Sequence, residues 1–178
     1  SEAGVFAFGF DRDHDKNANL TVLYPDGTSV ERKLAVAPRD WQIQRVEGVP
    51  SKYVTPPPEA MAAIARATKL KTEARATRAA GSFFTETFIW PATGPISGVF
   101  GSQRYYNGEP RRPHYGVDVA GRTGTPIRGP AGGTVTLADG DMYFEGGLVF
   151  LDHGQGVTSL MMHMSRVDVT AGARVEQG

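Results

Sequence analysis

Residues 133–165 read GTVTLADGDMYFEGGLVFLDHGQGVTSLMMHMS, and this stretch decides the fold class of the chain. Its three apolar runs, at residues 133–137, 147–153 and 157–165, are separated by turns that contain Gly and Asp. Short runs of this kind at regular spacing predict antiparallel β-sheets. The same pattern begins at residue 83, so we expect everything from there onward to be β-structure.

The first third of the chain predicts a small β-domain. Residues 4–10 (GVFAFGF), 20–24, 30–36 and 41–46 have the composition of short strands. Pro25-Asp26-Gly27 stands between the second and third of them, where its turn-forming residues predict a hairpin.

A helix is expected between these two β-regions. The TPPP sequence at residues 55–58 breaks the chain, and residues 59–80 are rich in Ala, Lys, Glu and Arg without Gly or Pro. Gly81 is expected to end the helix. Its apolar stripe (Met61, Ile64) is thin, which suggests a connector on a domain surface. The predicted fold is mainly β, divided into a small β-domain at 1–54, a linker and helix at 55–81, and a second domain at 82–178.

Composition excludes several classes of protein. Basic and acidic residues number 19 each in the 178 residues, so the chain lacks the basic excess of a nucleic-acid-binding protein. The absence of Cys excludes disulfides, a thiolate metal site and a Cys nucleophile. No apolar run approaches the roughly 18 residues of a membrane span. No signal peptide opens the chain at Ser1, so an exported protein would be present here in mature or trimmed form.

Two segments carry candidate chemistry. His114 and Asp118 are separated by three residues, and Gly116 permits a bend that would bring both to one metal ion. Imidazole and carboxylate are ligands of catalytic zinc, which lowers the pKa of water and polarises carbonyl groups. Spacing alone favours a surface His beside a turn Asp. His163, in an apolar strand, is about equally well explained as a hydrogen-bonded core residue or as a functional one.

The combination of segments resembles the lysostaphin-like (LytM-type) zinc metallopeptidases. The resemblance covers residues 90–178 and follows the family order through SGVFGSQR (97–104), HYGVDVA (114–120), GTPIRGPAGGTV (124–135), LDHGQG (151–156), MHMS (162–165) and VTAGARVEQG (169–178). It implies an antiparallel β-sandwich or barrel-like peptidase domain of the duplicated hybrid motif type. The opening β-region and helix also look like the amino-terminal part of envelope-located members.

The resemblance also implies residue roles. His114 and Asp118 would be zinc ligands, and His163 would be the catalytic histidine that orients water or stabilises the oxyanion. Arg104 is the candidate supporting residue. The family's third ligand lies in a later His-x-His strand, and this sequence has no such motif. We therefore expect the peptidase domain to be C-terminally incomplete, with weak zinc binding and no hydrolysis by this chain alone.

The implied activity of the intact protein is that of a zinc metalloendopeptidase. Its substrates would be stem peptides or cross-bridges of bacterial peptidoglycan, and the family cleaves bonds that involve Gly, D-amino acids or diaminopimelate. Its location would be the cell envelope, periplasmic or secreted. A protein partner that binds through the N-terminal domain is a further expectation.

The sequence raises two alternative functions. A non-catalytic LytM-like domain would bind and activate other cell-wall hydrolases; retention of His114, Asp118 and His163 favours an enzyme instead. A lipoyl or phospho-carrier module, suggested by residues 125–130, is disfavoured because no Lys follows Lys71.

The remaining polar candidates are interpreted as structural or solvated. His153 is expected to be structural, His14 to be solvated, and the pair Arg111 and Arg112 to lie in a solvated loop. The aspartates before residue 16 resemble the start of a calcium loop, but Lys16 and Val22 replace its Gly and Glu, which excludes an EF-hand.

Overall fold

The computed structural model describes residues 4–178, which form two compact units. The sheet unit comprises residues 4–7, 48–97 and 118–178, and the hairpin unit comprises residues 8–47 and 98–117. Each unit is described by itself below.

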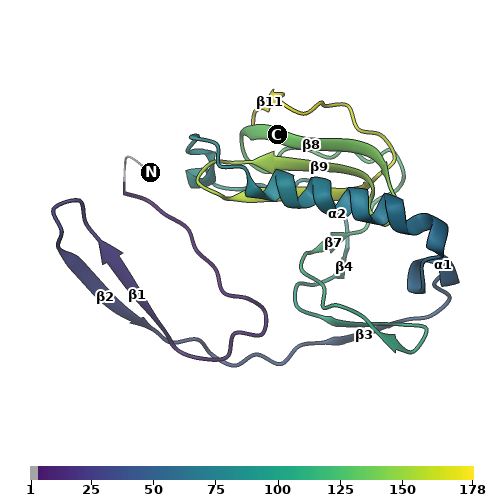
Figure 1. Cartoon of the computed structure of the whole chain (residues 1–178), viewed down its shortest axis with the longest axis horizontal. Helices are drawn as coiled ribbons and strands as arrows, with labels where there is room; N and C mark the ends of the chain where they lie inside the picture. Colours follow the sequence, from purple (N-terminus) through teal and green to yellow (C-terminus); the bar gives the residue numbers. More distant parts are fainter. Residues whose placement is uncertain (1–3) are drawn as a thin grey trace. The chain divides into compact units, whose positions relative to one another are not determined.

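A four-stranded antiparallel sheet forms the centre of the sheet unit (Figure 1). Its strands are β8 (Gly133–Met142), β9 (Gly146–Asp152), β10 (Thr158–Met164) and β11 (Arg174–Val175), in the order β10-β9-β8-β11. The three apolar runs at residues 133–165 thus form the three long strands, as predicted. Six of the seven residues of β9 are buried, which matches its nearly continuous apolar sequence.

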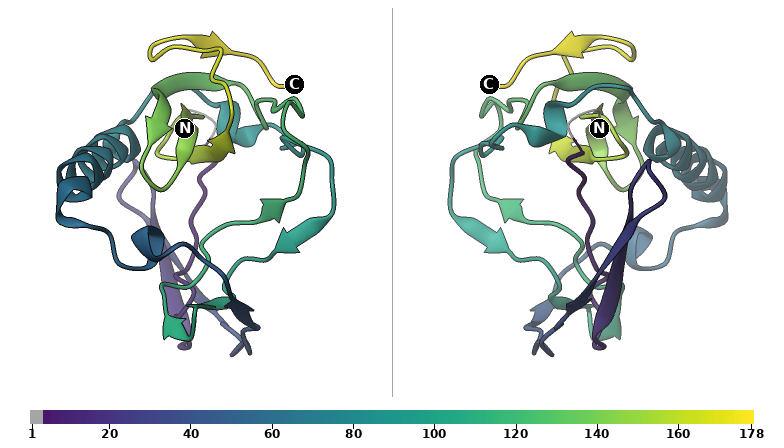
Figure 2. Two further views of the ribbon diagram at one scale, coloured as in Figure 1. Left: turned by 90° about the vertical axis from the view of Figure 1, so that its right-hand side faces the viewer. Right: turned by 90° about the vertical axis from the view of Figure 1, so that its left-hand side faces the viewer.

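Helix α2 (Met61–Ala76) covers one face of this sheet (Figure 2). Its buried residues Ala67 and Ala74, with Leu70 between them, recur every three or four positions and therefore share one helix face. The small alanine side chains let the helix approach the sheet closely. The core on this side also includes Leu137, Met142, Leu148 and Phe150. The opposite face is packed by Val135, Val149 and Leu151 together with residues of β10 and the chain that follows it.

The helix differs from its prediction in two respects. It ends at Ala76 instead of Gly81, and of the expected stripe only Ile64 is half-buried, whereas Met61 is 54% exposed. The alanines that make the contact do not stand out in an apolar pattern. The helix is therefore a packed layer of the sheet unit, with more contact than the predicted surface connector.

Shorter elements complete the sheet unit. Helix α1 (Ser51–Val54) and a 3₁₀ turn at Pro58–Ala60 precede α2, and a second 3₁₀ turn spans Phe83–Thr85. Strands β4 (Ile96–Gly98) and β7 (Asp118–Val119) pair with each other.

The hairpin unit contains the predicted hairpin. Strands β1 (Ala18–Leu23) and β2 (Ser29–Leu34) pair antiparallel. Gly27 has a positive φ of 84°, and Asp26 accepts hydrogen bonds from the Thr28 amide and hydroxyl. The predicted turn at Pro25-Asp26-Gly27 is therefore confirmed, with Gly supplying the left-handed conformation. The predicted strand at residues 4–10 is wrong, because these residues form no strand.

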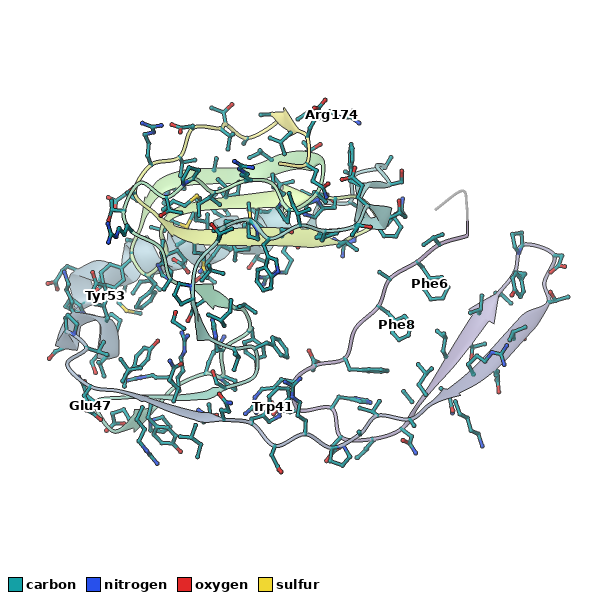
Figure 3. The ribbon with its side chains drawn as sticks, turned by 180° about the vertical axis from the view of Figure 1, so that it is seen from behind. Phe6, Phe8, Trp41, Glu47, Tyr53 and Arg174 are labelled. Atoms are coloured by element: carbon teal, nitrogen blue, oxygen red, sulfur yellow. The ribbon has the colours of Figure 1, made fainter. Side chains whose placement is uncertain are left out.

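A second sheet of the hairpin unit joins distant parts of the sequence. Strand β3 (Ile43–Val46), which follows Trp41 and precedes Glu47 in Figure 3, pairs parallel with β5 (Gln103–Tyr106). β5 also pairs with β6 (Glu109–Pro110). The two compact units are not divided at residues 54 and 81, where the sequence predicted domain boundaries. The predicted division into domains stays a prediction.

None of the helices between residues 4 and 178 is both long enough and apolar enough to cross a membrane.

Candidate functional site

His163 lies in a β-bulge of β10. Up to Met161 the strand pairs residue by residue with β9, and pairing resumes at Met164 one residue out of step. Met162 and His163 therefore stand together opposite the single residue Leu148. Both are exposed, although the same strand packs Leu160 and Met161 against the core. The bulge explains how a polar side chain leaves an apolar strand.

The backbone of His163 is in the left-handed region, with φ of 63°. A side chain makes this conformation unfavourable by roughly 1–2 kcal/mol. The surrounding structure compensates, because the His163 amide donates a 2.8 Å hydrogen bond to the Glu145 carbonyl in the turn between β8 and β9. Strained residues of this kind concentrate at functional sites. The geometry therefore favours the functional interpretation of His163 over a hydrogen-bonded core histidine.

His114 lies between β6 and β7, in the hairpin unit. Its backbone N–H donates to Ser102 O (2.9 Å), and its carbonyl accepts from Gly101 N (2.7 Å). The side-chain Nδ1 is 3.2 Å from Val99 O. A carbonyl can only accept, so Nδ1 carries the proton and the lone pair of the neutral ring is on Nε2. Metal-binding histidines commonly have this backbone-oriented tautomer, so the donor chemistry of His114 fits a zinc ligand.

Asp118 begins β7 in the sheet unit and is half-buried. His114 belongs to the other unit, so the predicted convergence of His114, Asp118 and His163 stays a prediction. No group of three or more His, Asp or Glu side chains among residues 4–178 is arranged to hold a metal ion.

The arginine candidates lie in the hairpin unit. Arg104 Nε donates to Gln44 Oε1 at 3.0 Å and so links the parallel strands β5 and β3. Arg112 is exposed, as expected for a solvated residue. Arg111 is half-buried, and its Nε is shielded from solvent, so its assignment to a solvated loop is wrong. The role of Arg104 at a catalytic site stays a prediction.

His153 is structural, as predicted. It is completely buried (0% exposed), with Nδ1 2.6 Å from Gly132 O and Nε2 2.6 Å from Ser159 Oγ. The ring of Phe88 packs edge-on against it. Both ring nitrogens are thus satisfied inside the protein, which leaves His153 no ready role in catalysis.

Asp152, next to His153, was not singled out from the sequence. Its carboxylate accepts hydrogen bonds from the Thr77 hydroxyl and from the amides of Ala79 and Gly154. Burial acts to raise its pKa, but these hydrogen bonds and the nearby His153 together lower it below 3.8. The Asp152-x-Gly154 spacing could have indicated this role, because an Asp side chain often accepts a hydrogen bond from the backbone amide two residues later.

His14 is not solvated, which corrects the prediction. Its ring stacks on Phe10 at 4.6 Å, and its Nε2 is buried without a hydrogen-bond partner among the described residues. It lines a cavity of about 350 Å³ whose other walls are Arg12, Asp13, Asp15, Ala37, Pro38, Arg39 and Trp41. This cavity contains none of the three predicted catalytic or metal-binding residues.

Known proteins are similar to parts of this chain. Residues 112–178, which include His114, Asp118 and His163, match the model described as peptidase family M23. A lipoprotein NlpD/LppB homolog of Pseudomonas aeruginosa is 33% identical over 51% of the chain. A protein named as an uncharacterized metalloprotease of Haemophilus influenzae is 40% identical over 38% of it. The cell division protein DipM of Caulobacter vibrioides is 28% identical over 70% of it.

The chain spans only 28%, 14% and 19% of the lengths of these three relatives, respectively. A crystal structure from Pseudomonas aeruginosa that carries the name peptidase M23 matches 92% of the chain and 60% of its own, with a TM-score of 0.67 and 30% identity. The family model covers the part of the chain that carries the predicted motifs from His114 onward. Residues 112–178 therefore match peptidase family M23, and the chain is similar in sequence and fold to the LytM-like peptidases of that family.

Proposed function

We propose that the protein is a zinc metalloendopeptidase that hydrolyses peptide cross-links of bacterial peptidoglycan in the cell envelope, either in the periplasm or after secretion. The observation that carries the proposal is the exposed, strained His163 at a bulge inside the matched region. The metalloprotease name of one relative supports the reaction class. The lipoprotein and cell division names of two others support the location and the theme of the cell wall.

His114 and Asp118 would hold the zinc ion. A neutral imidazole with its lone pair on Nε2 and a carboxylate are the donor types that zinc accepts. When bound, zinc would polarise the scissile carbonyl and acidify a water molecule. Because a catalytic zinc relies on three protein ligands, two ligands alone would bind it weakly.

His163 would assist the reaction from a position outside the metal's ligands. Its imidazole would accept a proton from the attacking water or donate a hydrogen bond to the oxyanion of the tetrahedral intermediate. The exposed position at the bulge leaves the ring accessible to a substrate. Loss of this group would therefore slow the chemical step more than it would weaken metal binding.

The test compares zinc affinity and hydrolysis of purified peptidoglycan for this 178-residue chain and for the full product of its gene. We expect weak zinc binding and no hydrolysis by the former, and activity from the latter. In the full protein, His114→Ala should lose both zinc and turnover, whereas His163→Ala should keep zinc and lose turnover.

His14→Ala is the matched control, because His14 lies outside residues 112–178 and should leave both readouts unchanged. Full activity of the 178-residue chain would contradict the assigned ligand set and would make His163 a candidate third ligand.

The second candidate is a non-catalytic domain that activates other cell-wall hydrolases. Relatives named for cell division and as a lipoprotein favour it. A full gene product that binds a wall hydrolase and raises its rate, but has no activity of its own with zinc supplied, would establish this function instead.

A further inference from the structure

The turn between β8 and β9 is fixed by contacts with helices α1 and α2. It consists of Tyr143, Phe144 and Glu145, and Gly146 follows with a positive φ of 60°. We call residues 143–145 the anchored turn. The Tyr143 hydroxyl donates a 2.8 Å hydrogen bond to the carbonyl of Lys52 in α1. Its ring also meets the ring of Tyr53, labelled in Figure 3, edge-on at 5.8 Å.

Helix α2 holds the other end of the anchored turn through an ion pair. Lys71 Nζ binds Glu145 Oε1, and the two side chains are only 23% and 11% exposed. Glu145 Oε2 is also shielded from solvent and has no hydrogen-bond partner in the described part of the chain. Lys71 is thus the cation that compensates a largely buried carboxylate. Without it, the Glu145 carboxylate would be a largely buried charge with no counter-charge and would move toward water.

The anchored turn contacts the backbone of the candidate catalytic residue. The carbonyl of Glu145 accepts the His163 amide, which the bulge has taken out of the regular ladder. Strand β9 lies close to β10 just beyond the bulge. A Cβ atom added to Gly147 would stand only 2.3 Å from the carbonyl oxygen of Met164. Glu145 therefore joins Lys71, through its side chain, to His163, through its carbonyl.

We propose that Lys71 and Glu145 are positioning residues that hold His163 in its left-handed conformation through the anchored turn. The proposal rests on the catalytic role of His163 in the proposed function. The ion pair fixes the turn to α2, and the turn supplies the acceptor that offsets the strain at His163. The imidazole is thereby presented in one orientation, which a catalytic group requires.

The first test measures amide hydrogen exchange by NMR in the 178-residue chain. Lys71→Met should speed exchange of the His163 amide by on the order of tenfold, while the Val149 and Leu151 amides keep their rates. Lys69→Met is the matched control: it removes the exposed Lys69–Glu73 pair of the same helix, with side chains 77% and 58% exposed, and should change nothing at His163.

A charge exchange, Lys71→Glu with Glu145→Lys, should restore slow exchange at His163. Tyr143→Phe, which removes only the hydrogen bond to Lys52, should give a smaller increase at His163 and decides the matter if Lys71→Met fails to fold. An unchanged His163 rate would overturn the proposal, as would a uniform increase over all strand amides.

The second readout is turnover of peptidoglycan by the full gene product. Lys71→Met should lower kcat with little change in KM, and the charge exchange should recover it. If the wild-type protein has no turnover, the proposed function fails, yet the exchange rates still decide whether Lys71 and Glu145 position His163. If the protein is active but its kcat does not respond to Lys71→Met, the positioning role is contradicted and the proposed function is not.

Discussion

The chain directly after β9 and the bulge of β10 each hold a histidine, in opposite environments. His153 is buried with both nitrogens satisfied, whereas His163 is exposed at a residue with positive φ. The buried and hydrogen-bonded His153 stabilises the fold, whereas the strained backbone at His163 destabilises it. The comparison indicates that burial and satisfied hydrogen bonds identify a structural histidine, and that exposure on a strained backbone identifies a functional candidate.

The largest effect is expected from Asp152→Ala at the end of β9. This substitution leaves the Thr77 hydroxyl and the amides of Ala79 and Gly154 without their acceptor. The free energy of unfolding should fall by about 3–5 kcal/mol, as measured by urea denaturation. Asp168→Ala, in a fully solvated pair with Arg166, should leave the midpoint unchanged. A midpoint as high as that of the wild type would show that Asp152 is not structural.

His153→Ala should have the next largest effect. It removes a fully buried ring and two hydrogen bonds, and should lower the free energy of unfolding by about 3 kcal/mol. His163→Ala should change stability far less, because its ring is exposed. Equal losses for the two variants would remove the distinction between the two regions.

Replacing His163 by Gly instead of Ala isolates the backbone strain. Gly adopts a φ of 63° without steric cost, so His163→Gly should be about 1 kcal/mol more stable than His163→Ala. Thermal unfolding of both variants gives the comparison, and both should lose turnover in the full gene product. A more stable Ala variant would indicate that His163 has an ordinary strand conformation in solution.

The smallest effect is a pH dependence. The pKa of Asp152 in the folded protein lies below its ordinary value of 3.8, so folding favours the ionised form. The resulting stability is complete above the unfolded-state pKa and is lost as pH falls through the folded-state value. Asp152→Asn should therefore flatten the decline of unfolding free energy below about pH 4. An identical acid limb in both proteins would contradict the lowered pKa.

The sequence predicted those elements well in which the apolar runs and the turn residues indicate the same local structure. The runs at residues 133–137, 147–153 and 157–165 became β8, β9 and β10, and the hairpin around Asp26-Gly27 formed as expected. Residues 4–10 show the limit of this reasoning. Their apolar and aromatic composition favours a strand, but strand formation depends on a partner that composition does not specify.

The end of α2 shows the same limit. Composition supports a helix up to Gly81, yet it ends at Ala76, where Thr77 takes up an extended conformation. The Thr77 hydroxyl and the Ala79 amide bind Asp152, which lies 73 to 75 residues away in the sequence. A buried carboxylate of another element therefore outweighs the helix propensity of these residues.

The sequence by itself determined the mainly β class, the family motifs and the candidates His114, Asp118 and His163, because these depend on residue types at fixed spacings. Only the tertiary structure decided which histidine is buried, which arginine is shielded, and that His163 occupies a bulge held by Glu145. The physical reason is that burial, register shifts and backbone strain arise from contacts between distant residues. Local pattern sets which strands form, and packing between them sets how each polar group is used.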